Sequence, residues 1–539
     1  MDLKSYPEVK KAKNFDIKDT GRIAIGLLFI LGVMIYTSIS SSGIEHNALL
    51  IVASIFGGYM AMNIGANDVA NNVGPAVGAG ALTLLGAIVI AAVFESMGAL
   101  IAGGDVVGTI KKGIIDPSLI ADTQTFIWIM MAALLSGAIW LNLATALGAP
   151  VSTTHSIVGG VMGSGIAAAG FSIVSWGTMG KIAASWIISP VLGGIIAAGF
   201  LYAIKKTIIF RDDKIDAAKK WIPVYISVMS WAFITYLVLK GMKHLVKVQF
   251  LPALGIGLIS AVVIYFIIKP LIQKQADKME NHRESINTLF TIPLIFSAAL
   301  LSFAHGANDV ANAVGPLAGI SDAIMSGGIA KKASIPLWVM MVGALGISIG
   351  LALYGPKLIR KVGSEITELD QARAFCVALA AAITVIIASW LGLPVSSTHI
   401  AIGGVFGVGF LREYLMRINN KEEELIEDIK EVHLDTEMEK LKEYEKALES
   451  LGSLKKADPF VVKTLVEKIN QEKNIIANIV DGEIKLTKIE KKALKAVKKY
   501  ELVKRSALKM IVAAWIVTVP AAAILSAMFF FMIRGILLP

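Results

Sequence analysis

Apolar runs recur along most of this 539-residue chain, separated by short polar segments. Because a helix needs about 20 mostly apolar residues to cross a bilayer, these runs predict membrane spans. Shorter apolar pieces follow the Asn-Asp sequences at 67–68 and 308–309, and others lie around 156–170 and 400–413. They begin just after polar, glycine- or proline-bearing sequence, which is typical of broken or re-entrant helices lining a cavity. The pattern predicts an all-α, polytopic membrane protein with about 12 membrane segments. The longer candidate spans are 23–40, 47–64, 81–102, 125–147, 180–204, 222–240, 250–269, 288–304, 336–354, 372–391 and 508–533.

One stretch interrupts this pattern. Between Arg417 and Arg505 the chain has 20 basic and 19 acidic residues, too many charges for a membrane segment. Apolar residues at helical spacing within 422–451 and 460–480 predict a small soluble helical insertion on the cytoplasmic side. Its lysine-rich end, 491–505, lies beside the last span, where we expect contact with membrane lipids.

Composition agrees with a membrane protein. Hydrophobic residues make up 55% of the chain and charged residues 17%, and the mean hydropathy is +0.69, which excludes an ordinary soluble globule. The net charge of +10 comes largely from short basic clusters beside spans, as at 111–112 and 331–332, where the positive-inside bias would place them. Nucleic-acid binding is therefore not expected. The single cysteine, Cys376, leaves no disulfide framework.

Two polar motifs each occur twice, in the same order. Gly-Ala-Asn-Asp-Val-Ala-Asn stands at 65–71 and again at 306–312, a separation of 241 residues. Pro-Val-Ser-Thr-Thr-His at 150–155 and Pro-Val-Ser-Ser-Thr-His at 394–399 are 244 residues apart. Nearly equal separations indicate a duplicated unit. Duplicated membrane units can be parallel or inverted, and the sequence does not count spans well enough to decide between them. Because transporters commonly build one midplane site from inverted halves, we expect two inverted repeats.

These positions predict six parts. No small-residue cleavage site clearly follows the first apolar run, so we expect it to be an uncleaved span. The expected parts are an N-terminal tail and first span (1–45), membrane repeat 1 (46–204), connecting spans and a linker (205–285), membrane repeat 2 (286–415), a cytoplasmic helical insertion (416–506) and a C-terminal span (507–539).

The Pro-Val-Ser blocks have the chemistry of an anion site. Proline suits a helix start because the helix does not use its missing N–H, and hydroxyl side chains can cap the free N–H groups there. A helix N-terminus inside a low-dielectric pocket attracts negative charge. The alternative is that the hydroxyls only cap helices or bond to nearby carbonyls. The hydroxyl residues expected to bind the anion are Ser152, Thr153, Thr154, Ser396, Ser397 and Thr398.

The Asn-Asp heptads need a different role, because a bare carboxylate repels an anion. A charge inside the membrane is costly unless it faces a cavity or a partner, and carboxylate and amide oxygens suit small hard cations. Asp68 or Asp309 could instead accept a hydrogen bond from a protonated oxyanion, which monohydrogen phosphate can donate and sulfate cannot, so both are also expected phosphate ligands. Alternatively, these side chains satisfy the backbone of broken helices. The expected sodium ligands are Asn67, Asp68, Asn71, Asn308, Asp309, Asn312, Ser152 and Ser396.

Together, the paired motifs resemble the inorganic phosphate transporter (PiT) family, over roughly 45–204 and 286–413. The resemblance implies phosphate uptake coupled to sodium or protons through two inverted repeats. Glu95 matches a family glutamate linked to transport, and the segment containing Thr109 resembles the motif that follows it, so coupling roles are expected for both. One departure is Ala378, where many members carry a glutamate upstream of the second Pro-Val-Ser block.

Two other candidates have simpler interpretations. Glu95 could pair with Lys111, Lys112 or a backbone donor and only fix helix packing. His155 and His399 could form a metal site only if both halves brought them together with further ligands, so capping or hydrogen bonding is expected for them instead.

The expected function is a cation-coupled symporter, with sodium preferred, that imports inorganic phosphate across the cell (inner or plasma) membrane by alternating access. No enzyme activity and no cofactor are expected, sodium being a co-transported ion, and the resemblance implies a homodimer. A proton-coupled phosphate permease and a permease for sulfate or another oxyanion stay open. A remote alternative is an intramembrane aspartyl protease with Asp68 and Asp309 as its dyad, which would leave the hydroxyl blocks without a role.

Overall fold

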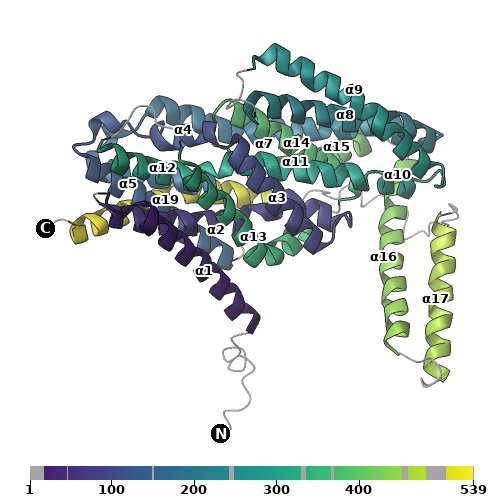
Figure 1. The fold of residues 1–539 in the computed structure, drawn as a ribbon. Helices are drawn as coiled ribbons and strands as arrows, with labels where there is room; N and C mark the ends of the chain where they lie inside the picture. Colours follow the sequence, from purple (N-terminus) through teal and green to yellow (C-terminus); the bar gives the residue numbers. More distant parts are fainter. Residues whose placement is uncertain are drawn as a thin grey trace, which may run out of the picture. The chain divides into compact units, whose positions relative to one another are not determined.

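The computed structural model describes residues 17–44, 46–147, 151–241, 248–328, 335–365, 369–419, 422–451, 459–480 and 505–537. This part of the chain is helical and has no strands, only an isolated β-bridge between Ile115 and Val174. The chain divides into two compact units (Figure 1). We name Met1–Gly409 with Val503–Pro539 the membrane unit, and Phe410–Leu502 the helical insertion.

The membrane unit contains most of the helices. They are α1 (Ile17–Ser40), α2 (Asn47–Gly78), α3 (Leu84–Ala102), α4 (Gly104–Lys112), α5 (Thr123–Leu147), α6 (Thr153–Ala169), α7 (Trp176–Ile204), α8 (Lys214–Lys240), α9 (Phe250–Ala276), α10 (Arg283–Leu289), α11 (Thr291–Asp309), α12 (Ala311–Ser326), α13 (Leu337–Glu365), α14 (Gln371–Trp390), α15 (Ser397–Asn419), which begins in this unit, and α19 (Arg505–Leu537), with short turns η3 (Pro117–Leu119), η4 (Phe171–Ile173) and η5 (Lys205–Ile209).

Eleven helices among the described residues are long and apolar enough to cross a membrane, and each coincides with a predicted apolar run. The all-α, polytopic membrane fold is therefore confirmed. Several helices extend beyond their apolar run. For example, α8 begins at Lys214 rather than at 222, because the Asp213 side chain accepts a hydrogen bond from the Asp216 N–H and caps a polar first turn. The two short apolar pieces correspond to α6 and α15.

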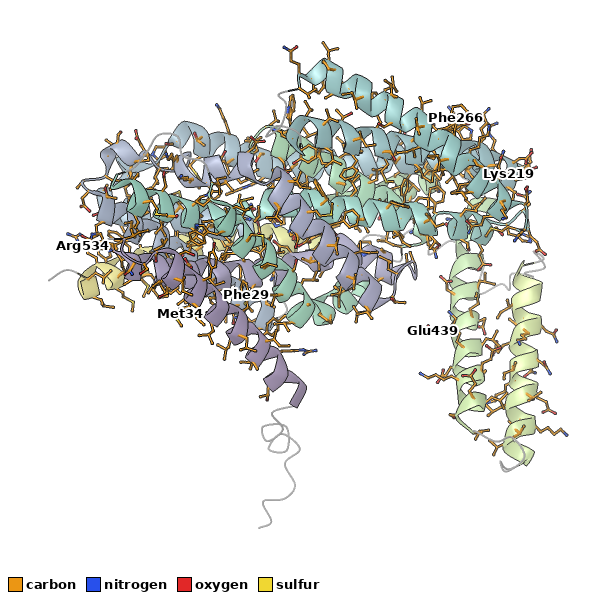
Figure 2. All side chains as sticks on the ribbon, in the orientation of Figure 1. Phe29, Met34, Lys219, Phe266, Glu439 and Arg534 are labelled. Atoms are coloured by element: carbon orange, nitrogen blue, oxygen red, sulfur yellow. The ribbon has the colours of Figure 1, made fainter. Side chains whose placement is uncertain are left out.

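The outer surface of the membrane unit suits a lipid environment. Only 17% of the most apolar window of α9 is buried, and its exposed side chains include Leu251, Ile259 and Phe266. Phe266 projects away from the neighbouring helices (Figure 2). A helix that is apolar on its outer face needs hydrocarbon rather than water around it.

The two repeats interlock through equivalent glycines. Helix α2 packs along α13, and α11, which carries the second heptad, packs along α3. Gly65 and Gly306 are the first residues of the two heptads. A Cβ on Gly65 would overlap the backbone of Ile347 in α13, and one on Gly306 would overlap the backbone of Glu95 in α3. Glycine at both positions lets the helices that carry the heptads approach their partners closely.

A second pair of crossings relates the last helix to α7. Gly163 of α6 lies against the backbone of α19, and Gly407 of α15 lies against the backbone of α7. Both partner helices carry similar sequence, Trp-Ile-Ile-Ser-Pro at 186–190 and Trp-Ile-Val-Thr-Val-Pro at 515–520. We propose that α19 is the counterpart of α7. The predicted separate C-terminal span would then belong to repeat 2, which the insertion interrupts.

The helical insertion contains a helical hairpin formed by α16 (Glu422–Ser450) and α17 (Pro459–Val480), which pack on each other. An ion pair of 3.2 Å joins Lys473 Nζ to Glu445 Oε1, and Lys468 lies over the Tyr444 ring. The lysines expected to contact lipid, at 491–504, lie outside the described residues, as do 1–16 and the start of the first Pro-Val-Ser block, 148–150.

Candidate functional site

The two heptads occupy helices that continue beyond the predicted spans. The first heptad lies inside α2, which runs on to Gly78, whereas in the second copy α11 ends at Asp309 and α12 begins at Ala311. All the asparagine and aspartate side chains of both heptads are buried. Polar side chains can continue a membrane helix where other protein groups satisfy them, so their partners define the site.

The hydroxyl blocks form the first turns of α6 and α15. Ser152 Oγ accepts a hydrogen bond from the His155 N–H at 3.1 Å, and Ser396 Oγ accepts one from the His399 N–H at 3.4 Å. These two serines therefore cap their helices, as the simpler sequence interpretation allowed. Of the residues that follow them, Thr153, Ser397 and Thr398 donate their hydroxyls to the aspartates of the heptads. Thr154 donates instead to the Val395 carbonyl at 2.9 Å.

Asp68 joins the two repeats. Thr153 of repeat 1 donates its hydroxyl to Asp68 Oδ2 at 2.7 Å, and Thr398 of repeat 2 donates to Asp68 Oδ1 at 3.3 Å. The Asn71 amide donates to Thr398 Oγ1 at 2.9 Å. Residues more than 300 positions apart thus meet at one buried carboxylate.

Asp309 has a different environment. Ser397 donates its hydroxyl to Asp309 Oδ2 at 3.1 Å, whereas Asp309 Oδ1 is buried and has no hydrogen-bond partner among the described residues. The nearby Asn312 amide donates across the repeats, to Thr153 Oγ1 at 3.2 Å and to Thr154 Oγ1 at 3.1 Å. The two aspartates are therefore not equivalent, since Asp309 keeps an acceptor oxygen that Asp68 does not.

The first asparagine of each heptad mainly ties helices together. Asn308 donates to Ser389 Oγ at 2.9 Å and accepts from the Val395 N–H at 3.2 Å, which fixes the segment ahead of α15. The Asn67 amide lies 2.9 Å from the Thr145 hydroxyl of α5. These contacts agree with the interpretation that some heptad amides satisfy local structure.

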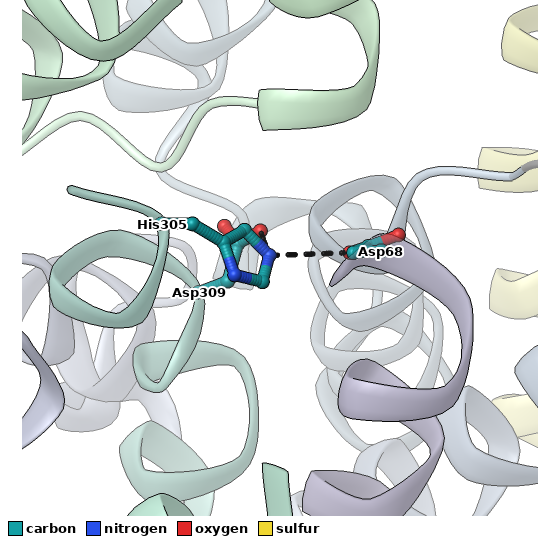
Figure 3. A group of neighbouring side chains, drawn as sticks. All are labelled: Asp68, His305 and Asp309. Atoms are coloured by element: carbon teal, nitrogen blue, oxygen red, sulfur yellow. Dashed lines mark ion pairs between the residues drawn. The ribbon is translucent and has the colours of Figure 1, made fainter. Parts of the chain in front are cut away.

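A histidine that the sequence analysis did not select lies between the aspartates (Figure 3). His305 Nε2 is 2.7 Å from Asp309 Oδ2 and 3.9 Å from Asp68 Oδ2, and all three side chains are buried. His305 stands directly before the second heptad, where the first repeat has Ile64. Comparison of the residues that flank the two copies could have found it.

Glu95 supports this histidine from behind. Its Oε1 lies 3.0 Å from His305 Nδ1 and accepts a hydrogen bond from the Asn72 amide at 2.9 Å. The alternative pairing of Glu95 with Lys111 is wrong, because Lys111 pairs with Asp322 of α12 at 3.0 Å. Glu95 is therefore linked to the aspartates through the His305 ring.

The remaining candidates lie outside this cluster. Thr109 donates its hydroxyl to the Gly392 carbonyl at 2.6 Å and so joins α4 to the segment ahead of α15. The His155 and His399 rings lie 5.0 Å apart between centroids, and Trp186 packs on His155 at 3.8 Å. The structure therefore brings the two histidines together, and neither belongs to the cluster of His305 with the aspartates.

Comparison with known proteins assigns the family. The sequence profile of the phosphate transporter family matches residues 64–526, most of the chain. The chain belongs to the phosphate transporter family. This confirms the resemblance predicted from the paired motifs.

Similar proteins agree with this family. A Helicobacter pylori (strain J99) protein, named as an inferred phosphate permease, is 50% identical over 534 residues, 98% of both chains. A Pyrococcus abyssi protein of the same description is 41% identical over 363 residues, covering 67% of this chain and 89% of its own. A solved structure titled as the sodium-dependent phosphate transporter has a TM-score of 0.70 and 31% identity, covering 91% of this chain and all of that one.

The family fixes the class of function. This is a multi-pass membrane protein of a phosphate transporter family, not of an enzyme family. The protease hypothesis for Asp68 and Asp309 is therefore wrong. Because a transporter binds its substrate only transiently, the relevant chemistry is binding and exposure to alternate sides rather than bond cleavage.

Proposed function

We propose that this protein imports inorganic phosphate across the cell membrane together with sodium, by alternating access around the site at Asp68. The observation that carries the proposal is the pair of hydroxyls, one from each repeat, that converge on the buried Asp68 carboxylate. A site assembled from both halves changes whenever the halves move relative to each other, as alternating access requires. The solved sodium-dependent phosphate transporter supports sodium as the coupling ion.

The phosphate side of the site would be the first turns of α6 and α15. Both helices begin here, so their unpaired N–H groups and dipoles favour an anion. Thr153 and Thr398 can turn their hydroxyls from Asp68 to a phosphate oxygen, and the Asn71 and Asn312 amides lie within hydrogen-bond distance of those hydroxyls. On phosphate binding, the hydrogen bonds from these two hydroxyls to Asp68 would be exchanged for hydrogen bonds from the same hydroxyls to phosphate.

The cation side would be the two aspartates. Two buried carboxylates inside a membrane protein cost several kcal/mol unless a positive charge compensates them. Sodium is a hard cation that suits their oxygens. A sodium ion here would also reduce the repulsion of phosphate, and by linkage phosphate would tighten sodium binding by the same factor. This reciprocal effect is the thermodynamic basis of symport.

The free oxygen of Asp309 favours phosphate over sulfate. Asp309 Oδ1 is a buried acceptor without a donor among the described residues. Monohydrogen phosphate carries an O–H that can donate a hydrogen bond to Asp309 Oδ1, whereas sulfate at neutral pH has no O–H. A site that hydrogen-bonds a substrate hydroxyl rejects an analogue lacking it, because the buried group stays unpaired. The homodimer, the particular membrane and the lipid contact stay predictions from the resemblance and the charge pattern.

The test is uptake of labelled phosphate into proteoliposomes that contain the purified protein. A sodium gradient at equal internal and external pH should drive uptake, and a proton gradient in potassium buffer should not. Excess sulfate should leave the uptake unchanged. Uptake that follows the proton gradient and ignores sodium would favour the proton-coupled alternative, and strong inhibition by sulfate would favour a general oxyanion permease.

A further inference from the structure

Sodium binding by Asp68 and Asp309 does not explain why a histidine, His305, lies in the same cluster. Each residue offers one ligand atom, and these atoms lie within 4.8 Å of one another. Sodium sites are built from oxygen, whereas imidazole nitrogen suits zinc, copper, iron and nickel. His305 Nε2 nevertheless lies toward both carboxylates (Figure 3). The first repeat has Ile64 at the equivalent position, so the duplication alone does not account for the histidine.

The spacing of the ligand atoms is close to that of a tetrahedral metal site. Metal–ligand distances of about 2.1 Å place neighbouring tetrahedral ligands about 3.4 Å apart. The distances from His305 Nε2, 2.7 Å to Asp309 Oδ2 and 3.9 Å to Asp68 Oδ2, lie on either side of that value. The ligand atoms of the two aspartates lie within 4.8 Å of each other, so shifts of about 1 Å would seat an ion among the three atoms.

Glu95 supplies the support that metal-binding histidines ordinarily have. A histidine that ligates a metal usually donates its other ring N–H to a carboxylate, which fixes the tautomer and the ring orientation. Glu95 Oε1 lies 3.0 Å from His305 Nδ1, and the Asn72 amide holds the same oxygen at 2.9 Å. With Nδ1 engaged in this way, Nε2 is left to face the aspartates.

An acceptor is also left over at the site. Asp309 Oδ1 is buried without a hydrogen-bond partner among the described residues, which is a cost unless a ligand approaches it. Three protein ligands with a fourth position open to water or another ligand are the usual arrangement of a catalytic zinc site, in contrast to the four protein ligands of a structural one. Water or the transported anion could occupy that position.

We propose that Asp68, His305 and Asp309 bind one divalent first-row transition-metal ion, with Zn²⁺ as the best fit, and that the bound ion blocks phosphate uptake. Asp68 belongs to α2 of repeat 1, while His305 and Asp309 belong to α11 of repeat 2. An ion held by both repeats opposes their relative movement and occupies the carboxylates proposed for sodium. The metal site itself does not depend on which cation drives transport.

Cobalt binding tests the site without a transport assay. The full-length protein is purified, treated with a chelator, dialysed and titrated with CoCl₂, and the visible d–d absorption of protein-bound Co²⁺ is followed. We expect saturation at one Co²⁺ per chain. His305→Gln should remove this signal, and Glu95→Gln should weaken binding by about 10- to 100-fold. His399→Gln is the matched control, because His399 is also a buried membrane histidine but lies outside the cluster, and it should bind Co²⁺ as the unaltered protein does.

Two results would overturn the proposal: no saturable Co²⁺ signal in the unaltered protein, or a signal that His305→Gln leaves intact. Zinc X-ray absorption on the unaltered protein guards against a variant that fails to fold. One imidazole nitrogen with oxygen ligands supports the site, and two or more imidazoles contradict it.

In chelator-treated proteoliposomes Zn²⁺ should inhibit uptake and a chelator should restore it. If the protein takes up phosphate but binds no metal, the metal site is rejected and the proposed function stands. If the protein binds the metal but takes up no phosphate, the proposed function is rejected and the metal site stands.

Discussion

The two oxygens of the Asp68 carboxylate accept hydroxyl groups from different repeats, from Thr153 at 2.7 Å and from Thr398 at 3.3 Å. The paired motifs predicted that these residue types would share a site, because only a common pocket explains two costly carboxylates beside two sets of hydroxyls. The sequence could not predict that both oxygens of Asp68 accept hydrogen bonds, whereas Asp309 Oδ1 has no donor within the described part of the chain. That difference depends on how the two repeats meet in space, and near-identical motifs hide it.

Removing one hydroxyl tests this arrangement. Thr153→Val keeps the shape of the side chain but leaves Asp68 Oδ2 without its closest donor, a change that costs about 1–3 kcal/mol in a buried site. We expect the kcat/KM of phosphate uptake to fall about tenfold or more. Thr153→Ser is the matched control, since it retains the hydroxyl and should stay much closer to the unaltered rate. Equal rates for the valine and serine variants would contradict a binding role for this hydroxyl.

At the scale of helices, the apolar runs predicted the position of every span, but not how the spans pack. The heptads were predicted to interrupt helices, yet α2 continues through the first heptad and only a single residue, Val310, separates α11 from α12. Interruption was expected because polar groups are rare in membrane helices. The helices persist because hydroxyls from both repeats satisfy those groups, and such contacts between distant parts of the chain are not visible in a local pattern.

The glycines at the helix crossings carry a prediction about stability. Gly306→Ala would place a Cβ against the backbone of Glu95, so α11 and α3 would have to separate. Overpacking of this kind costs about 1–3 kcal/mol, and we expect a lower thermal unfolding midpoint for the purified protein in detergent. Gly199→Ala in α7 is the control, because a Cβ at that position would meet no atom within 4 Å and alanine favours a helix. An unchanged midpoint for Gly306→Ala would argue against the close crossing.

At the scale of the whole molecule, the charge pattern predicts an insertion among the membrane segments, and the structure divides the chain into two compact units at Phe410. The proposed correspondence of α19 to α7 was not part of the sequence prediction, because the insertion separates α19 from 286–415 and the shared Trp-Ile motif is short. The Pyrococcus abyssi relative aligns with 67% of this chain but 89% of its own, so that protein is shorter than this one.

The insertion should therefore be dispensable for phosphate transport itself. Replacing 422–504 with a flexible linker should leave the initial rate of phosphate uptake, per reconstituted protein, close to that of the full-length chain. The site residues all lie in the membrane unit, which is why we expect this result. Loss of uptake by a variant that still inserts and elutes as one species would show that the insertion takes part in the transport cycle.

The most direct test of the composite site is the reciprocal effect of sodium and phosphate on binding. Labelled phosphate binding to the purified full-length protein is measured in sodium and in potassium buffers at one pH, and sodium binding is measured with and without phosphate. We expect sodium to tighten phosphate binding within the usual range of coupled sites, about 5- to 150-fold, and phosphate to tighten sodium binding by the same factor. A phosphate Kd that is the same in sodium and in potassium would contradict a site in which one cluster of residues binds both ions.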